Sequence, residues 1–190
     1  MQKRYHLYLR QHPNDWYTVS VLTHPAYAAF GPALPALREE IAAVLADELA
    51  SGALDPDEDT WFEDLTRMAL ELELKAVQHD RLIRVPLRVS LVVRPLPELG
   101  TDHFEVRAPR LGQVFRIVGR EDILPWAEEL VRGEFHLEPV EALLPYQYAR
   151  GERIETLEVT WHGGKAKRAK AKARREREDD DDLPRRGTPL

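Results

Sequence analysis

The sequence contains no cysteine among its 190 residues, and serine occurs only at Ser20, Ser51 and Ser90. The lack of cysteine excludes disulfides, cysteine-ligated zinc, iron–sulfur clusters and a thiol nucleophile. Long apolar runs are missing too: no stretch approaches the ~18 apolar residues of a membrane-spanning helix, and the first residues lack the apolar core of a signal peptide. We therefore expect a cytoplasmic protein that does not enter a membrane.

The motifs of common catalytic chemistry are also missing from the sequence. It has neither of the glycine-rich phosphate loops, Gly-x-x-x-x-Gly-Lys and Gly-x-Gly-x-x-Gly, and no His-Glu-x-x-His zinc helix. A Gly-x-Ser-x-Gly nucleophile elbow does not occur either. We therefore expect no enzymatic activity within these residues and no cofactor.

Charge, in contrast, is plentiful and unevenly distributed. The 27 basic and 33 acidic side chains give a net charge of −6. Residues 165–190 hold ten basic and six acidic groups, a net charge of +4, so residues 1–164 carry −10. Charge dominates 165–182, where alanine is the sole apolar residue type, and such a segment cannot build a core. The sequence thus predicts one folded domain over 1–164 and a disordered charged linker over 165–190.

Alternation of apolar and polar residues predicts most of the secondary structure. We expect a hairpin over 4–10 and 16–23, and a strand pair within 68–95. A second hairpin is expected over 103–108 and 113–118, and a last strand over 154–161. Helical periodicity predicts one helix between Pro35, which suits a first turn, and Gly52, which suits a helix end. A second helix is expected between Asp122 as N-cap and Gly133 as its end.

This order, ββα-ββ-ββα-β, is typical of an α+β domain with mostly antiparallel sheets and two helices. The succession strand, proline-containing turn, strand, helix occurs twice, within 3–52 and 103–133. One interpretation is an internal duplication, with sub-units 1–52 and 103–161 bridged by the strand pair 68–95.

Two small groups of residues are candidates for a site. Trp61 and Phe62 follow an acidic loop and form either an exposed hydrophobic docking site or an anchor that packs the loop on a sheet. Glu134, His136 and Glu138 would point to one side of an extended segment, as ligands of a divalent ion do. A solvated strand edge explains the same three residues, so we expect no metal.

A basic block begins the charged linker and comprises Lys165, Lys167, Arg168, Lys170, Lys172, Arg174 and Arg175. Such a block can neutralise phosphates and give salt-dependent affinity for nucleic acid. The alternative is a soluble linker whose charge is cancelled by the acidic run 179–182. Because the folded body is acidic, we expect a protein partner, with nucleic acid as the alternative.

Two resemblances bear on function. Residues 5–50, with the hairpin YHLYLRQHPNDWYTVSVL and the helix ALREEIAAVL, resemble the strand–strand–helix unit of HicB-like antitoxin domains. The charged linker that runs into Arg186-Gly187-Thr188-Pro189-Leu190 resembles the junction before the first ATPase module of Clp/Hsp100 AAA+ unfoldases. The first likeness implies a nucleic-acid-associated regulator, and the second an accessory N-terminal domain plus linker, with the ATPase following.

We therefore expect a non-enzymatic domain that recruits substrates or adaptors to a Clp-like AAA+ unfoldase or chaperone. Docking would use an exposed sheet edge or the surface around Trp61 and Phe62, because a sheet edge can bind an extended peptide by strand addition. The alternative is a HicB-like or nucleic-acid-associated regulator that uses the basic block.

Overall fold

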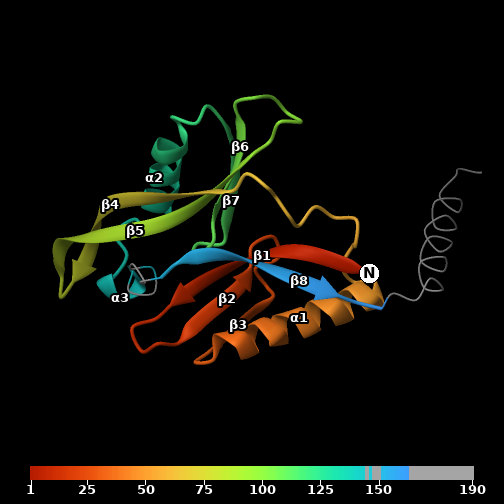
Figure 1. Ribbon diagram of the computed structural model, residues 1–190. Helices are drawn as coiled ribbons and strands as arrows, with labels where there is room; N and C mark the ends of the chain where they lie inside the picture. The colour runs from red at the N-terminus through yellow and green to blue at the C-terminus, as the bar shows by residue number, and fades with distance from the viewer. Residues whose placement is uncertain (144–145, 147–150, 163–190) are drawn as a thin grey trace, which may run out of the picture.

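The computed structural model has two four-stranded antiparallel sheets, which we name sheets A and B, each with a helix against one face (Figure 1). It describes residues 1–143, 146 and 151–162. Sheet A has the order β3-β2-β1-β8 and sheet B the order β4-β5-β6-β7. The strands are β1 (Gln2–Gln11), β2 (Tyr17–Val21), β3 (Ala28–Gly31), β4 (Thr66–Gln78), β5 (Arg81–Pro95), β6 (His103–Ala108), β7 (Gln113–Val118) and β8 (Arg153–Thr160). The helices are α1 (Leu34–Ser51), α2 (Ile123–Glu134) and α3 (Val140–Leu143).

The α+β class is confirmed, and every strand predicted from alternation is present. The strand Ala28–Gly31 and the single turn Val140–Leu143 were not expected. No helix in the described part of the chain is long and apolar enough to cross a bilayer. The linker predicted over 165–190, with its basic block and the segment 186–190, lies outside the described residues.

The core of sheet A is formed by α1 on one face. The helix buries Leu37, Ile41, Leu45 and Leu49, which recur at three- and four-residue steps and pack against the apolar side chains of all four strands. Gly52 ends the helix in the left-handed conformation, with φ of +81°, a backbone geometry that glycine adopts without the penalty of a Cβ atom. The predicted end of this helix is therefore confirmed.

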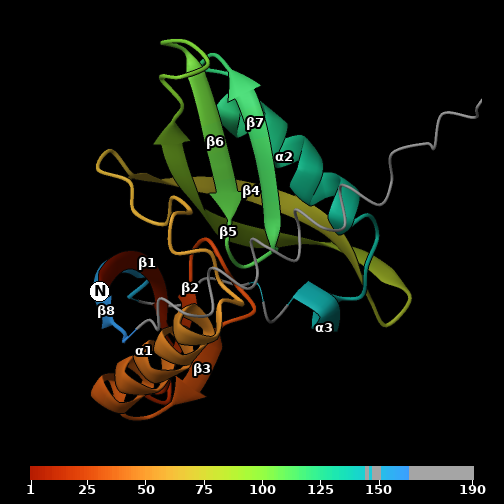
Figure 2. The ribbon, with the colours of Figure 1, turned by 90° about the vertical axis from the view of Figure 1, so that its right-hand side faces the viewer.

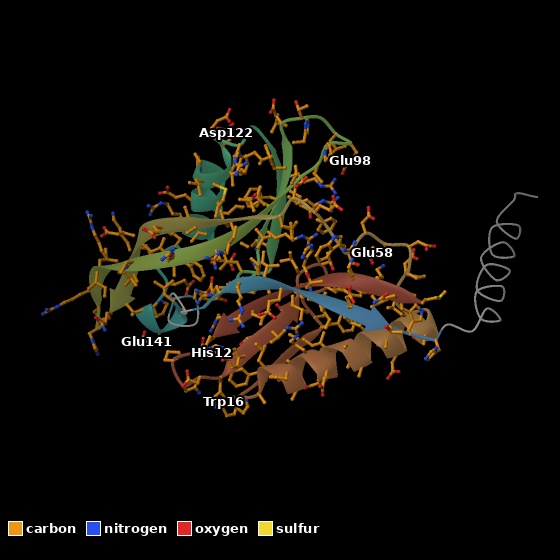
Figure 3. The ribbon with its side chains drawn as sticks, in the orientation of Figure 1. His12, Trp16, Glu58, Glu98, Asp122 and Glu141 are labelled. Carbon is orange, nitrogen blue, oxygen red and sulfur yellow. The ribbon has the colours of Figure 1, made fainter. Side chains whose placement is uncertain are left out.

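The core of sheet B is formed in the same way by α2, which buries Ile123, Ala127 and Val131. Asp122 stands at the start of this helix (Figure 3), but its side chain makes no capping hydrogen bond. The predicted end at Gly133 is wrong by one residue, because the helix continues to Glu134. Nothing lies within 4 Å of the position a Cβ atom would take at Gly133, so this glycine is not required by a close contact.

The strands are grouped differently from the sub-units expected from the sequence. The strand pair β4–β5 belongs to the same sheet as β6–β7, and β8 returns to pair with β1 over Gln2–Leu9. Sheet A therefore joins the two ends of the described chain, and sheet B is its middle. The sheets meet at a small apolar cluster of Tyr8, Leu22 and Val92, with Leu65 and Ile154 packed against it.

Candidate functional site

The outer strand β7 of sheet B has no described strand beside its outward-facing backbone groups (Figure 2). Gly119 N–H donates to the carbonyl oxygen of Asp102 at 2.9 Å, and this bond together with the register fixes which residue pairs of β6 and β7 are hydrogen-bonded. Because bonded and non-bonded pairs alternate along an antiparallel ladder, the N–H and C=O groups of Val114, Arg116 and Val118 point away from β6. The edge thus offers three donors and three acceptors.

The side chains of these same three residues share one face of the sheet. Val114 and Val118 are 50% and 57% exposed, and the Arg116 side chain is 68% exposed. An open edge strand with exposed β-branched residues is a template for pairing with another chain. We therefore take the β7 edge, defined by the outward backbone groups and side chains of Val114, Arg116 and Val118, as the candidate site.

A row of alternating charges crosses sheet B and ends at this edge. Arg94 of β5 lies opposite Glu105 of β6, which in turn lies opposite Arg116 of β7. Glu105 is 6% exposed and is held by the Arg107 guanidinium at 2.8 Å, while Arg116 Nη2 lies 3.8 Å from its other carboxylate oxygen. The row therefore ends on an exposed positive charge.

In sheet A, the outer edge at β8 has one of its outward backbone groups occupied by a side chain. Arg38 of α1 donates through Nη2 to the carbonyl oxygen of Thr156 at 3.0 Å, and its Nη1 lies 2.6 Å from Glu155. Met1 and Trp161 form a hydrogen-bonded pair, so alternation places the Thr156 carbonyl on the outer side of β8. Arg38 thus occupies a group that an added strand would need.

The edge at β4 is interrupted at two places, by a side chain and by a second segment of backbone. Arg132 of α2 donates to the carbonyl oxygen of Glu73 at 2.9 Å. Further along, Val77 N–H donates to the carbonyl oxygen of Glu138 at 3.1 Å, and Val77 forms a parallel bridge with Pro139. Both contacts use outward-facing groups of β4.

The two remaining edges are interrupted or short. On the side away from β4, the first half of β5 has no neighbour among the described strands, because β6 pairs with β5 only over 92–95. Pro86 lies in that half and has no N–H to donate, which blunts an edge. On the outer side of β3, register leaves only Ala28 and Phe30 with outward groups. Among the described residues, β7 is therefore the longest edge strand on which neither a contact nor a proline interrupts the outward backbone groups.

Trp61 and Phe62, the docking pair considered from the sequence, pack their loop onto sheet A. The Trp61 ring stacks on the His6 ring with 4.1 Å between centroids, and Arg4 lies 4.5 Å above Trp61. Phe62 lies under Arg94 at 3.8 Å. These contacts and their partial burial are those of a loop anchor, the second interpretation of this pair.

His6 is the polar centre of this anchor. Its Nε2 lies 3.0 Å from both the backbone nitrogen and the carbonyl oxygen of Phe62. Burial lowers the pKa of His6; the hydrogen bond to the Phe62 carbonyl opposes this shift, and the charge of Arg4 adds to it. A neutral imidazole can accept the Phe62 N–H, so the anchor is best formed when His6 is uncharged.

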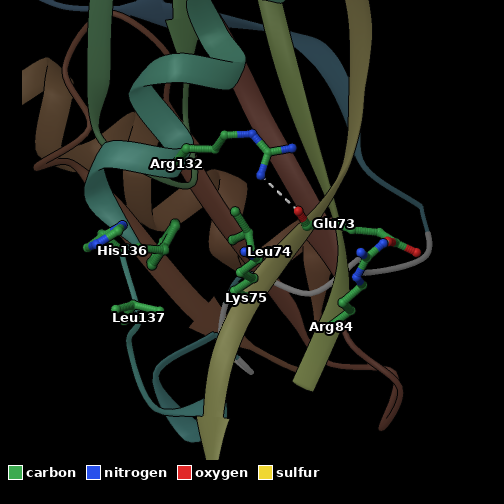
Figure 4. Close-up of a pocket in the computed structure, with 8 residues that line it drawn as sticks. Glu73, Leu74, Lys75, Arg84, Arg132, His136 and Leu137 are labelled. Atoms are coloured by element: carbon green, nitrogen blue, oxygen red, sulfur yellow. Dashed lines mark hydrogen bonds and ion pairs between the residues drawn. The ribbon is translucent and has the colours of Figure 1, made fainter. Parts of the chain in front are cut away.

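The three residues considered as metal ligands do not form a site. His136 lines a cavity of about 410 Å³ between β4, β5 and the end of α2 (Figure 4), whereas Glu134 and Glu138 are not among its lining residues. Three cations, Lys75, Arg84 and Arg132, line the same cavity, and they would repel a metal ion. Within the described ranges, no three histidine or carboxylate side chains are grouped as metal ligands.

A buried polar cluster at the meeting point of the two sheets was not predicted. Glu152, just before β8, accepts a hydrogen bond from Ser90 of β5, and its carboxylate lies 3.4 Å from Arg110 of the β6–β7 turn. Both ionic side chains are 2% exposed. Burial lowers the pKa of Arg110 and Glu152 opposes that shift; burial also raises the pKa of Tyr8, and the Glu152 charge adds to it.

The cluster comprises Tyr8, Ser90, Arg110 and Glu152, which come from distant parts of the chain, so no local pattern could have joined them.

Comparisons with models of protein families, with curated proteins and with solved structures find no match to this chain.

Proposed function

We propose that this chain is a protein-binding domain that takes up an extended segment of a partner protein as an additional strand beside β7. The observation that carries the proposal is the outward set of three N–H and three C=O groups on Val114, Arg116 and Val118. In strand addition, such main-chain groups supply affinity and alternate side chains supply specificity.

The treatment of the other edges supports this choice. β4 and β8 each have an outer carbonyl taken by an arginine from the helix of the same sheet, Arg132 and Arg38. Natural sheets cover or blunt edges because open ones pair with other chains. Among the described residues, an edge free of such contacts beside edges that carry them is therefore the part best suited to pairing.

We further propose that the partners are unfolded substrate chains or adaptor segments, recruited for a Clp-like AAA+ unfoldase. This part of the proposal is supported by the sequence alone, through the charged linker and the likeness of residues 186–190. Extended, unstructured segments are the form of chain that strand addition accepts.

The experiment blocks the edge in the full 190-residue chain. Fluorescently labelled, reduced and carboxymethylated α-lactalbumin serves as a permanently unfolded probe, with binding followed by anisotropy. The Val114→Pro substitution removes one outward N–H without touching the bonds to β6, and we expect at least about a tenfold loss of affinity. The matched control is Glu158→Pro, which removes an outward N–H from β8 and is expected to leave binding unchanged.

Circular dichroism of both proline variants verifies that the fold is retained. Failure of the wild-type chain to bind the probe, or equal binding by the Val114→Pro variant, would overturn the proposal. Binding of labelled nucleic acid that falls steeply with salt and disappears when residues 165–190 are removed, with no binding of the unfolded probe, would instead favour the nucleic-acid alternative and its basic block.

A further inference from the structure

We infer that the β7 edge selects segments in which an acidic residue is flanked, two positions away on each side, by β-branched apolar residues. The inference rests on the proposed function and concerns the sequence of the segment that is bound. It follows from the side chains that the edge presents on one face, taken in the order Val114, Arg116, Val118.

The central preference comes from the row of alternating charges. Arg94, Glu105 and Arg116 lie opposite one another on three successive strands, so the row reads positive, negative, positive. A strand that is added antiparallel beside β7 places one side chain directly opposite Arg116, with Cβ atoms about 4.5–5.5 Å apart. A carboxylate there continues the alternation, whereas a lysine or arginine would face a like charge.

Arg116 has the capacity for this contact. Glu105 is already held by Arg107, through Nε at 2.9 Å and Nη2 at 2.8 Å, and the nearest approach of Arg116 to it is 3.8 Å. The charge of Glu105 is thus matched closely by Arg107, and the Arg116 side chain stays 68% exposed, so its guanidinium can also contact an added strand.

The flanking preferences come from the two valines. Val114 and Val118 are 50% and 57% exposed, and each would face a side chain two positions from the acidic residue. Paired β-branched residues across neighbouring strands stabilise a sheet by burying apolar surface against each other. The pattern expected of the segment is therefore apolar, any, acidic, any, apolar.

The same arrangement argues against a second copy of this chain as the occupant. Two β7 strands paired antiparallel with Val114 opposite Val118 would place Arg116 opposite Arg116. Like charges directly opposite one another destabilise a strand pair, which is a common way to prevent self-association at an edge. The edge thus favours a partner that carries the complementary charge.

The test uses two labelled peptides of nine residues with the full chain at low salt. The first has the core Val-Thr-Glu-Thr-Val between threonines, and the second has lysine in place of glutamate. We expect the wild-type chain to bind the glutamate peptide about two- to fivefold more tightly than the lysine peptide. The Arg116→Glu variant should reverse this preference, and the Arg116→Gln variant, which keeps the size but not the charge, should abolish it.

The matched control is Arg84→Glu, which changes the net charge equally at an exposed arginine of β5. It is expected to keep the wild-type preference, so that a general effect of net charge is separated from the contact at Arg116. Equal binding of both peptides by wild type and by Arg116→Glu, with binding still lost in Val114→Pro, would overturn this inference and leave the proposed function standing. Binding of neither peptide, together with indifference of the unfolded probe to Val114→Pro, would overturn both.

Discussion

In sheet A, a side chain from the sheet's own helix occupies an outward carbonyl of the outer strand β8, whereas no described residue occupies an outward group of β7, an outer strand of sheet B. Both sheets have four antiparallel strands and one helix that covers a single face, so their architecture is alike. Arg38 reaches around the edge of sheet A to the Thr156 carbonyl. The arginine of β7, Arg116, instead lies on the face of its strand beside Glu105.

The difference lies in a few single contacts. One arginine takes an outward carbonyl of β8, and one arginine and one backbone contact each take an outward group of β4. The open state of β7 is therefore not a consequence of the fold class. It is a local property of Val114, Arg116 and Val118, and it can be tested by changing residues at each edge in turn.

The largest effect is expected where the two sheets meet. The Glu152→Ala substitution removes the carboxylate that lies 3.4 Å from the buried guanidinium of Arg110 and that accepts the Ser90 hydroxyl. Breaking one partner of a buried ion pair costs about 3–5 kcal/mol. We expect a loss of that size in the free energy of unfolding, measured by urea denaturation.

The matched control for this substitution is Glu128→Ala, which breaks the exposed pair with Arg132. An exposed pair of this kind is worth about 0.3–0.5 kcal/mol. If Glu152→Ala cost no more than Glu128→Ala, the buried cluster would not be what joins sheet A to sheet B, and the two sheets would have to be compared as separate units.

A smaller effect on the free energy of unfolding is expected from pH. It arises on the face of sheet A that α1 does not cover, where His6 holds the loop at Trp61 and Phe62. The pKa of His6 is lower in the folded chain than its ordinary value of 6.5, chiefly because the ring is buried. The unfolded chain therefore binds a proton more readily, so the stability contributed by neutral His6 is present above about pH 6.5 and is lost as the pH falls below it.

The His6→Gln variant removes this titration and keeps an amide that can bond to the Phe62 backbone. We expect its free energy of unfolding to fall less than that of wild type between about pH 7.5 and pH 5.5. His12 also has a lowered pKa, through burial and the charges of Arg10 and Arg110, so His12→Gln measures its separate share. An unchanged pH dependence in His6→Gln would show that the anchor does not depend on neutral His6.

Much of this fold follows from local pattern, and much of the site does not. The alternation at Leu70, Leu72 and Leu74 predicts a strand in spite of good helix formers, and it is correct because these leucines pack in the core of sheet B. The strand Ala28–Gly31 was missed because alanine and glycine have low strand propensity, and its pairing with β2 is set by the tertiary structure.

The candidate site illustrates the same limit. The sequence predicts a strand over 113–118 but not that it lies at an edge, because strand order depends on pairings between distant segments. The last described strand, β8, returns to pair with β1, so that β6 is the one neighbour of β7 among the described strands. Likewise, the sequence predicts Arg38 only as a polar residue on the surface of a helix. Its contact with the Thr156 carbonyl depends on the tertiary structure.

A small change in stability, and the sharpest test of the comparison, is expected at this arginine. The Arg38→Ala substitution removes a partly buried surface pair with Glu155 and one bond to the Thr156 carbonyl, which should cost about 1 kcal/mol or less. It also uncovers the outer side of β8 and makes that edge resemble β7. We therefore expect the Arg38→Ala chain to bind unfolded carboxymethylated α-lactalbumin at a second place.

The double variant Arg38→Ala, Val114→Pro separates the two edges. Val114→Pro alone should lose binding, and restoring it by uncovering β8 would show that an exposed set of backbone groups is sufficient for uptake of an extended chain. Arg84→Ala is the control, since it removes an equal charge from an exposed pair without uncovering a strand carbonyl. If binding stays lost in the double variant, the valines and arginine of β7 are required in addition to an open edge, because the β8 face presents Thr156 and Glu158 in their place.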